Sequence, residues 1–400
     1  VWADDADFDL SRHVVEEPLA EPGGERELAA KIAEHLGRPF DRAHPLWEFR
    51  LFRGYQGGDT VVFGRLHHTI GDGVALMMVL LAMTDVAPDG PATPSPAPAG
   101  QGLVANPILE LFHRPIRELD AVRAALEQLM PETLRLMLAP VEAMKRVNPL
   151  LKGVGSVAAL GRLVGRWNDP ATPFKGGLGV DKRVAWTGKV PLETLRDAGR
   201  ALGGTLNDVL NSAMTGGLRR YLQRYGTPPA DLAFRAAMPV NLRPLEEVAA
   251  LGNRFGLIFL SLPVGLADPL ARLEALQRRA SALKRSAEPA VVFGILTAMG
   301  VLPLAVHRLV VSLFQAKATA VFTNVPGPRR TLWLAGHAVR DIFFWVPQAG
   351  RLGLGVSIFS YDGNVRMGVG TDAGLVPDPE RIVDGFHAEL DELLKRAARV

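Results

Sequence analysis

Cysteine is absent from this chain of 400 residues. The absence excludes disulfides, cysteine-ligated zinc, a thiolate nucleophile and iron–sulfur clusters, and it fits a reducing compartment. Charge of one sign is also scarce, because 45 Lys and Arg offset 42 Asp and Glu to leave a net charge of +3, and aromatic residues make up 7%. This composition gives no electrostatic or stacking signal for nucleic acid, so no nucleic-acid partner is expected.

Apolar residues, by contrast, are plentiful at 48%, enough for a large core and for two to three domains of about 150 residues. The first residues are acidic and show no signal-peptide pattern. Asp, Glu, Lys and Arg are all missing between Pro289 and His307, but Gly294, Gly300 and Pro303 interrupt this run. We expect a buried or interfacial helix pair there and not a transmembrane span.

The remaining pattern is mixed α/β. We expect a helix at 26–36, strands at Phe49–Arg53 and Thr60–Leu66, and a buried helix at Gly73–Met83. A Pro-rich mobile surface loop or linker at Ala87–Gly102, amphipathic helical pieces over Leu103–Arg166 and a linker at Asp169–Asp181 are expected next. Further strands are expected at Arg183–Val190, Leu232–Pro239, Arg254–Pro263, Ala320–Asn324, Ala338–Val346, Leu352–Ser360 and Val365–Gly370, and helices at Leu192–Leu202, Asn207–Tyr225, Leu270–Lys284 and Pro379–Ala398. This order predicts two α/β layers with mixed sheets.

The most informative segment is His67–Gly73, between a predicted strand and a predicted buried helix. On an extended strand end, the side chains of His67 and His68 point to opposite sides, so one faces the core and the other a cleft. Neutral imidazole is suited to general-base chemistry. Asp72 has three readings: an N-cap for the helix, a salt bridge to an arginine, or a partner that orients His68. The opposed histidines disfavour a metal site, and none is predicted.

This segment resembles the HHxxxDG signature of CoA-dependent acyltransferases and peptide-synthetase condensation domains, which share a chloramphenicol-acetyltransferase-like fold of two α/β domains. Other segments resemble motifs of the bacterial wax ester synthase / diacylglycerol acyltransferase family: PLW at Pro45, Leu46 and Trp47, ND at Asn207 and Asp208, NVPGP at Asn324–Pro328, and a C-terminal hairpin at Ser360–Gly363. They follow the family's order along nearly the whole chain.

The resemblance implies an N-terminal domain at 1–165 without the family's first strand and helix, a linker at 166–181 and a C-terminal domain at 182–400. It implies transfer of an acyl group from CoA to a fatty alcohol or diacylglycerol, with His68 as the base and His67 and Asp72 in support. Asn207 either donates a hydrogen bond near the oxyanion or, with Thr205 and Asp208, simply begins a helix. The expected substrate-binding residues are Pro45, Leu46, Trp47, Gly73, Asp208, Asn324, Pro326 and Gly327, although Trp47 also suits an ordinary core and the NVPGP segment a plain turn.

Acyl-CoA is expected as a co-substrate, without a permanently bound cofactor. Its phosphates call for cations at the mouth of the cleft, for which the sequence offers Arg243, Arg254, Arg329 and Arg330. Basic residues scattered among apolar ones in Leu134–Gly165 suit either an interfacial helix or a helix that covers the core. We therefore expect a cytoplasmic protein at the inner membrane face or on lipid droplets. The alternatives are the same fold with an amine or sugar-lipid acceptor, and a non-catalytic droplet protein.

Overall fold

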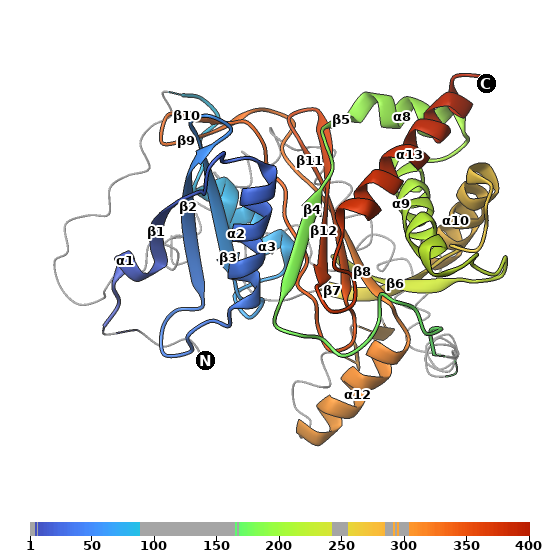
Figure 1. Cartoon of the computed structure of the whole chain (residues 1–400), viewed down its shortest axis with the longest axis horizontal. Coiled ribbons are helices and arrows are strands. Elements are labelled where there is room, and N and C mark those ends of the chain that lie inside the picture. The colour runs from blue at the N-terminus through green and yellow to red at the C-terminus, as the bar shows by residue number, and fades with distance from the viewer. Residues whose placement is uncertain are drawn as a thin grey trace. The chain divides into compact units, whose positions relative to one another are not determined.

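Two units make up the part of the chain that the computed structural model describes, which is residues 5, 7–88, 165, 168–241, 255–284, 291–292, 294–295 and 304–400 (Figure 1). Unit 1 contains α1 (Leu10–His13), β1 (Val14–Pro18), α2 (Glu25–Gly37), β2 (Trp47–Tyr55), β3 (Asp59–Leu66), α3 (Gly73–Ala82), β9 (Leu332–Leu334) and β10 (His337–Val339). The predicted domain boundaries at 165 and 182 remain a prediction.

Unit 2 contains the remaining described elements. They are β4 (Lys182–Trp186), β5 (Val190–Pro191), α8 (Leu192–Ala201), α9 (Leu206–Leu222), the short 3-10 helix η1 (Gln223–Tyr225), β6 (Phe234–Asn241), β7 (Phe255–Leu262), α10 (Pro269–Lys284), α12 (Leu304–Ala316), β8 (Ala320–Pro326), β11 (Leu354–Tyr361), β12 (Asn364–Asp372) and α13 (Glu380–Ala397).

Unit 1 has a three-stranded sheet in the order β1-β2-β3, in which β1 runs parallel to β2 and β3 antiparallel to it. Helix α2 buries Leu28 and Ile32, which recur at helical spacing, and its His35 packs against the rings of Phe52 and Phe63 on β2 and β3. The hairpin β9-β10 joins this unit through Asp85, whose backbone exchanges two hydrogen bonds with that of Trp333.

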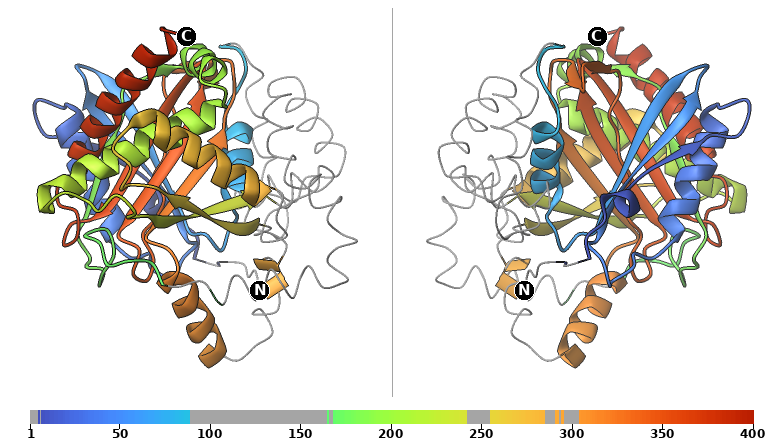
Figure 2. Two further views of the ribbon diagram at one scale, coloured as in Figure 1. Left: turned by 90° about the vertical axis from the view of Figure 1, so that its right-hand side faces the viewer. Right: turned by 90° about the vertical axis from the view of Figure 1, so that its left-hand side faces the viewer.

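Unit 2 has a mixed sheet in the order β4-β12-β11-β8-β6-β7, with β5 beside β12. Its centre is parallel, since β8 runs parallel to both β11 and β6, while the outer pairs are antiparallel. Figures 1 and 2 show α8, α9, α10 and α13 on one side of this sheet. The alternate residues Val356, Ile358 and Val369 point into the core that these helices share with the sheet.

The opposite face of this sheet lies against the extended chain that follows Phe343. Ser357 donates a hydrogen bond to the carbonyl of Phe344, and the indole N–H of Trp345 donates one to the carbonyl of Ala185 at 3.1 Å. A Cβ atom at Gly355 would lie 2.7 Å from the carbonyl oxygen of Val346. Glycine is therefore required where this segment crosses the strands.

Helices α9 and α13 cross at glycines. A Cβ atom at Gly217 would lie 2.8 Å from the backbone nitrogen of Phe386, and one at Gly385 would lie 3.0 Å from the Cα of Gly217. The two backbones therefore approach as closely as they can at this point, which no larger residue permits.

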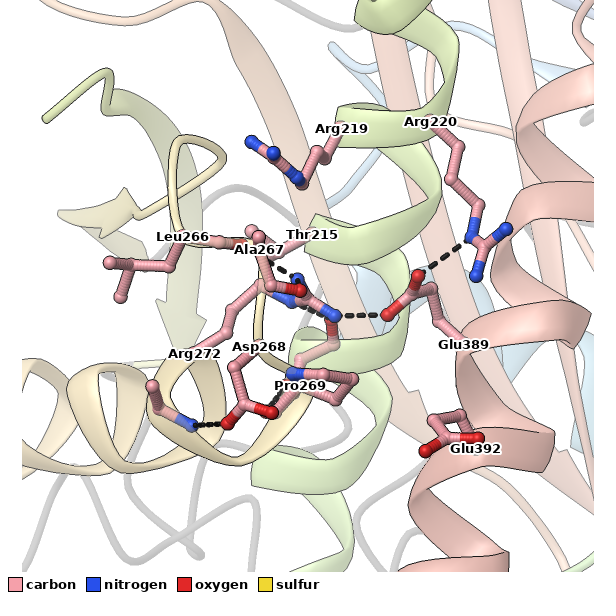
Figure 3. A network of polar contacts seen from close by, with 12 residues as sticks. Thr215, Arg219, Arg220, Leu266, Ala267, Asp268, Pro269, Arg272, Glu389 and Glu392 are labelled. Atoms are coloured by element: carbon pink, nitrogen blue, oxygen red, sulfur yellow. Dashed lines mark hydrogen bonds and ion pairs between the residues drawn. The ribbon is translucent and has the colours of Figure 1, made fainter. Parts of the chain in front are cut away.

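A charged network is buried beside this crossing (Figure 3). Arg272 of α10 is fully buried, and it forms an ion pair with Glu389 of α13, which is 5% exposed. The carbonyls of Ser212, Leu266 and Ala267 accept its other hydrogen bonds, and Arg220 pairs with the second carboxylate oxygen of Glu389 at 2.6 Å. Burial lowers the pKa of Arg272, and Glu389 opposes this effect.

Most of the predicted elements are confirmed to within a few residues, and the hairpin at Tyr361–Asn364 has positive φ at Asp362 and Gly363, as its turn requires. The predicted strand at Ala338–Val346 is wrong: only His337–Val339 pairs, and the rest crosses the face of the unit 2 sheet. The predicted strand at Arg183–Val190 is split into β4 and β5, because an extra residue between Trp186 and Val190 shifts the register against β12.

Some predicted features lie outside the described residues. These are most of the Pro-rich loop at Ala87–Gly102, the helical pieces of Leu103–Arg166 and most of Pro289–His307. The described part of the predicted linker is anchored on unit 2, since Phe174 is fully buried in its core. Among the helices in the described ranges, none combines the length and apolar character that crossing a bilayer requires.

Candidate active site

The two histidines lie on a tight turn between β3 and α3. The backbone N–H of His67 donates to the carbonyl of Leu46 at 2.9 Å, and the N–H of Ile70 closes the turn on the carbonyl of His67 at 2.9 Å. His67 is half-buried and His68 is exposed. Both residues lie beyond the end of β3 at Leu66, so the predicted alternation of an extended strand does not apply to them, and whether His68 faces a cleft stays a prediction.

The ring of His67 is held in place by its neighbours. The backbone N–H of Thr69 donates to Nδ1 of His67 at 3.2 Å, and the hydroxyl of Thr69 lies 2.9 Å from the same nitrogen. Because Nδ1 accepts, the proton of the neutral ring is on Nε2. The ring of Phe40 contacts His67 edge-on, and the guanidinium of Arg65 lies 4.4 Å from the centre of the Phe40 ring.

Sequence reasoning missed the ion pairs that support this arrangement. Arg65 binds the carboxylate of Glu48 at 2.7 Å, and Arg50 binds it at 2.6 Å. Burial alone would raise the pKa of Glu48, but the hydrogen bond from Arg50 and the charge of Arg65 outweigh burial and lower it. The only sequence signal was the position of these residues on neighbouring strands flanking Trp47 and His67.

Asp72 is the N-cap of α3, which confirms one of its three readings. Its Oδ1 accepts the backbone N–H of Ala75 at 3.1 Å, and its carbonyl accepts the N–H of Leu76 at 2.9 Å. The residue is 5% exposed. Asp72 therefore fixes the point at which the histidine turn becomes helix, and the exposed Gly73 is the first residue of that helix.

Trp47 is the most buried residue of the PLW segment, at 4% exposed, while Pro45 and Leu46 are half-buried. Its ring packs 4.5 Å from that of His13, whose Nδ1 hydrogen-bonds the carbonyl of Trp47 at 2.7 Å. The indole nitrogen of Trp47 and Nε2 of His13 are both buried, and neither has a hydrogen-bond partner among the described residues. Such unsatisfied polar atoms are uncommon in a core that serves only packing.

In unit 2, Asn207 of the ND segment meets Asn324 of the NVPGP segment. The side-chain nitrogen of Asn324, near the end of β8, donates to Oδ1 of Asn207 in the first turn of α9 at 2.6 Å. These residues are 117 positions apart, and nothing in the sequence pairs them. This bond occupies the amide oxygen of the exposed Asn207 and not its amide N–H groups.

Asp208 forms a capping box with Thr205, as the alternative reading of that motif predicted. The N–H of Thr205 donates to the carboxylate of Asp208 at 2.8 Å, and the N–H of Asp208 donates to the hydroxyl of Thr205 at 3.3 Å. Pro326 pairs with Ser360 at the end of β8, and Gly327 is buried.

Within the described ranges, no three His, Asp or Glu side chains are grouped closely enough to hold a metal ion. Arg329 and Arg330 are exposed. Arg243 and Arg254, the other predicted phosphate ligands, lie outside the described residues. The arrangement thus supplies imidazole, amide and aromatic groups, which suit proton transfer and hydrogen bonding.

Comparison with known proteins gives matches over both halves of the chain. Residues 1–210 match the wax ester synthase/diacylglycerol acyltransferase catalytic domain, and residues 251–394 match the WS/DGAT C-terminal domain. Two Mycobacterium tuberculosis proteins named as diacylglycerol O-acyltransferases are 29% and 28% identical to it. The first match covers 99% of this chain and 83% of the relative, and the second covers 100% and 82%.

Solved structures share the fold. The wax ester synthase/diacylglycerol acyltransferase of Marinobacter aquaeolei VT8 has a TM-score of 0.69 at 23% identity, covering 100% of this chain and 83% of that one. The nonribosomal peptide synthetase FmoA3 has a TM-score of 0.51 at 18% identity, covering 96% of this chain and 35% of that one. These likenesses confirm the predicted α/β fold.

Proposed function

The chain belongs to the wax ester synthase/diacylglycerol acyltransferase family and is an acyltransferase, and from this premise we propose that it moves a fatty acyl group from acyl-CoA to a hydroxyl group. The observation that carries the proposal is the exposed imidazole of His68, on a turn that His67 and Asp72 hold from either side. A general base must be accessible to its substrate, and the exposure of His68 is consistent with that requirement.

His68 is proposed to take the proton of the acceptor hydroxyl as its oxygen attacks the thioester carbonyl of acyl-CoA. The new C–O bond replaces the C–S bond, and the imidazolium then gives its proton to the departing CoA sulfur. The products are an ester and free CoA, and atoms and charge balance without a covalent enzyme intermediate.

Asn207 is proposed to donate a hydrogen bond to the oxyanion that develops on the carbonyl. Asn324 supports this role, because its bond to Oδ1 of Asn207 directs the amide N–H groups away from Asn324. A donor fixed before the reaction begins is worth more than one that must reorient. The PLW segment is proposed to line the acyl path, because its apolar side chains lie at the start of β2 and the carbonyl of Leu46 accepts the backbone N–H of His67.

The names of the relatives favour a diacylglycerol as the acceptor, since both Mycobacterium tuberculosis proteins are named as diacylglycerol O-acyltransferases. A long-chain alcohol is the second acceptor, because the matched family name includes wax ester synthesis.

Both acceptors are nearly insoluble in water, so we propose that the protein works at the surface of the inner membrane or of lipid droplets. Helix α12 supports this proposal with exposed Val311 and Leu313 beside exposed Arg308.

The test is release of free CoA from palmitoyl-CoA by the purified full chain, with a diacylglycerol, hexadecanol, an amine or a sugar lipid as the acceptor. The first two should support turnover. His68→Ala should lower kcat by about 100- to 10,000-fold without changing the unfolding temperature. The matched control is His67→Gln, which keeps a polar side chain on the same turn and should retain measurable turnover. Full activity in His68→Ala would place the base elsewhere.

A further inference from the structure

Unit 2 contains a pocket of about 380 Å³ bounded by α10, by β6 and β7, and by the chain at Asn168–Pro170. It is at the low end of the range for small-molecule sites. Arg235 directly precedes Ala236, which begins the register between β6 and β8, whereas Asn324 is near the far end of β8. The pocket and the Asn207–Asn324 pair are therefore at opposite ends of the β6–β8 pairing. The pocket is therefore separate from the residues proposed for catalysis in this unit.

The cation that faces this pocket is Arg279, which is half-buried. Its Nη1 donates to the carbonyl of Ser261 at 3.0 Å and to its hydroxyl at 2.9 Å. A guanidinium has five N–H donors, and the described residues accept only these two bonds from Nη1. No carboxylate in the described part of the chain forms an ion pair with it. Burial lowers the pKa of Arg279, and the neighbouring charge of Arg278 lowers it further.

The one carboxylate in the lining does not offset this charge, because it is already neutralised. Oδ2 of Asp169 accepts the backbone N–H of Arg235 at 2.7 Å and the hydroxyl of Thr319 at 2.8 Å, while its Oδ1 binds the guanidinium of Arg235 at 2.8 Å. The charges of Asp169 and Arg235 cancel, so the described residues of the lining keep the positive charge of Arg279. An uncompensated half-buried cation is costly unless an anion joins it.

The rest of the lining is largely apolar and includes Phe259, Ala282, Leu283 and Pro170. At about 30 Å³ for each water-sized group, the volume accepts roughly a dozen non-hydrogen atoms. We propose that this pocket binds a small anionic amphiphile, with its carboxylate or phosphate on Arg279 and Ser261 and a short apolar chain against Phe259 and Leu283.

The experiment titrates the full chain with octanoate, octyl phosphate, octanol and inorganic phosphate by calorimetry. Octanoate or octyl phosphate should bind, and Arg279→Gln should weaken that binding by about tenfold or more through loss of charged hydrogen bonds. The tighter of the two identifies the head group. Octanol or inorganic phosphate binding as tightly as either would overturn the proposal, as would equal binding by wild type and Arg279→Gln.

Two further variants separate binding from folding. Arg278→Gln is the matched control, because Arg278 is the exposed neighbour on the same helix and pairs with Glu274; it should leave affinity within about twofold. Ala282→Phe adds bulk at an exposed position that lines the pocket and should weaken binding with Arg279 intact. Unchanged affinity in Ala282→Phe would also count against the pocket. CoA release is measured separately, so failure here leaves the proposed reaction untouched.

Discussion

Replacing Glu389 with glutamine should destabilise unit 2 more than any other single conservative change of charge described above. The variant keeps the shape of the side chain but removes the charge that faces the fully buried Arg272. Loss of one partner from a buried pair costs about 3–5 kcal/mol. Three backbone carbonyls still accept hydrogen bonds from Arg272, so we expect the lower end, about 3 kcal/mol.

The matched control is Glu392→Gln, one turn further along the same helix. Glu392 is 40% exposed and pairs with Arg396 four residues on, a surface pair worth about 0.3–0.5 kcal/mol. The assay is equilibrium unfolding in urea followed by circular dichroism, with both variants and wild type at one salt concentration. A cost below about 1 kcal/mol for Glu389→Gln, or costs that match in the two variants, would refute the reasoning.

A double replacement tests the same reasoning from the other side. Arg272→Met with Glu389→Leu removes both charges and fills the space with apolar atoms, and it should recover most of the stability that Glu389→Gln loses. A double variant less stable than Glu389→Gln would contradict this reasoning. The loss in Glu389→Gln would then come from losing a stabilising ion pair and not from leaving Arg272 buried without a counter-charge.

Three further expectations come from other parts of the chain. Burial lowers the pKa of His35 from 6.5, against the charge of Glu17, so the unfolded chain binds the proton more readily than the folded chain. The stability that neutral His35 contributes is therefore present above pH 6.5 and falls as the pH drops through the lowered pKa. In His35→Phe, the urea midpoint should depend less on pH across this range than in wild type. Asn324→Ala should lower kcat about tenfold with KM and unfolding temperature unchanged, as CoA release will show, because Asn207 loses its fixed orientation; a changed KM alone would contradict it. Gly385→Ala should cost about 1–3 kcal/mol in urea unfolding, because its new Cβ meets Gly217; no loss would mean that the helices can separate freely.

Local structure could be predicted from the sequence wherever the interactions that determine it lie within a few residues of one another. Asp72 caps α3 through a bond to Ala75, three residues away, and the turn at Asp362 and Gly363 needs only its own backbone angles. The predicted strand at Ala338–Val346 was wrong because its second half crosses the face of the unit 2 sheet. The carbonyl of Phe344 accepts from Ser357, and Val346 lies against Gly355. These residues are apolar because they pack on a sheet face and not because they pair as a strand.

The sequence predicted which residues belong to the candidate site, but it did not predict the contacts between them. The motifs pointed to His68, Asn207 and Asn324 one by one, but the bond that joins the two asparagines spans 117 residues. The buried pair of Arg272 and Glu389 spans the same number of positions, and a charged residue in a helix is ordinarily taken for a solvent-facing one. Such pairings depend on tertiary packing, which periodicity does not encode.

The hairpin β9-β10 is synthesised long after the other described strands of unit 1. Its backbone bonds to Asp85 come from Trp333, and Arg340 pairs with Asp59 at 2.6 Å. The ribosome makes these residues roughly 270 positions after β3, which at about 5–20 residues per second is a delay of roughly 15–50 seconds. Through that interval the nascent unit 1 lacks β9, β10 and Arg340, so the backbone of Asp85 and the carboxylate of Asp59 wait for these partners until nearly the whole chain has been made.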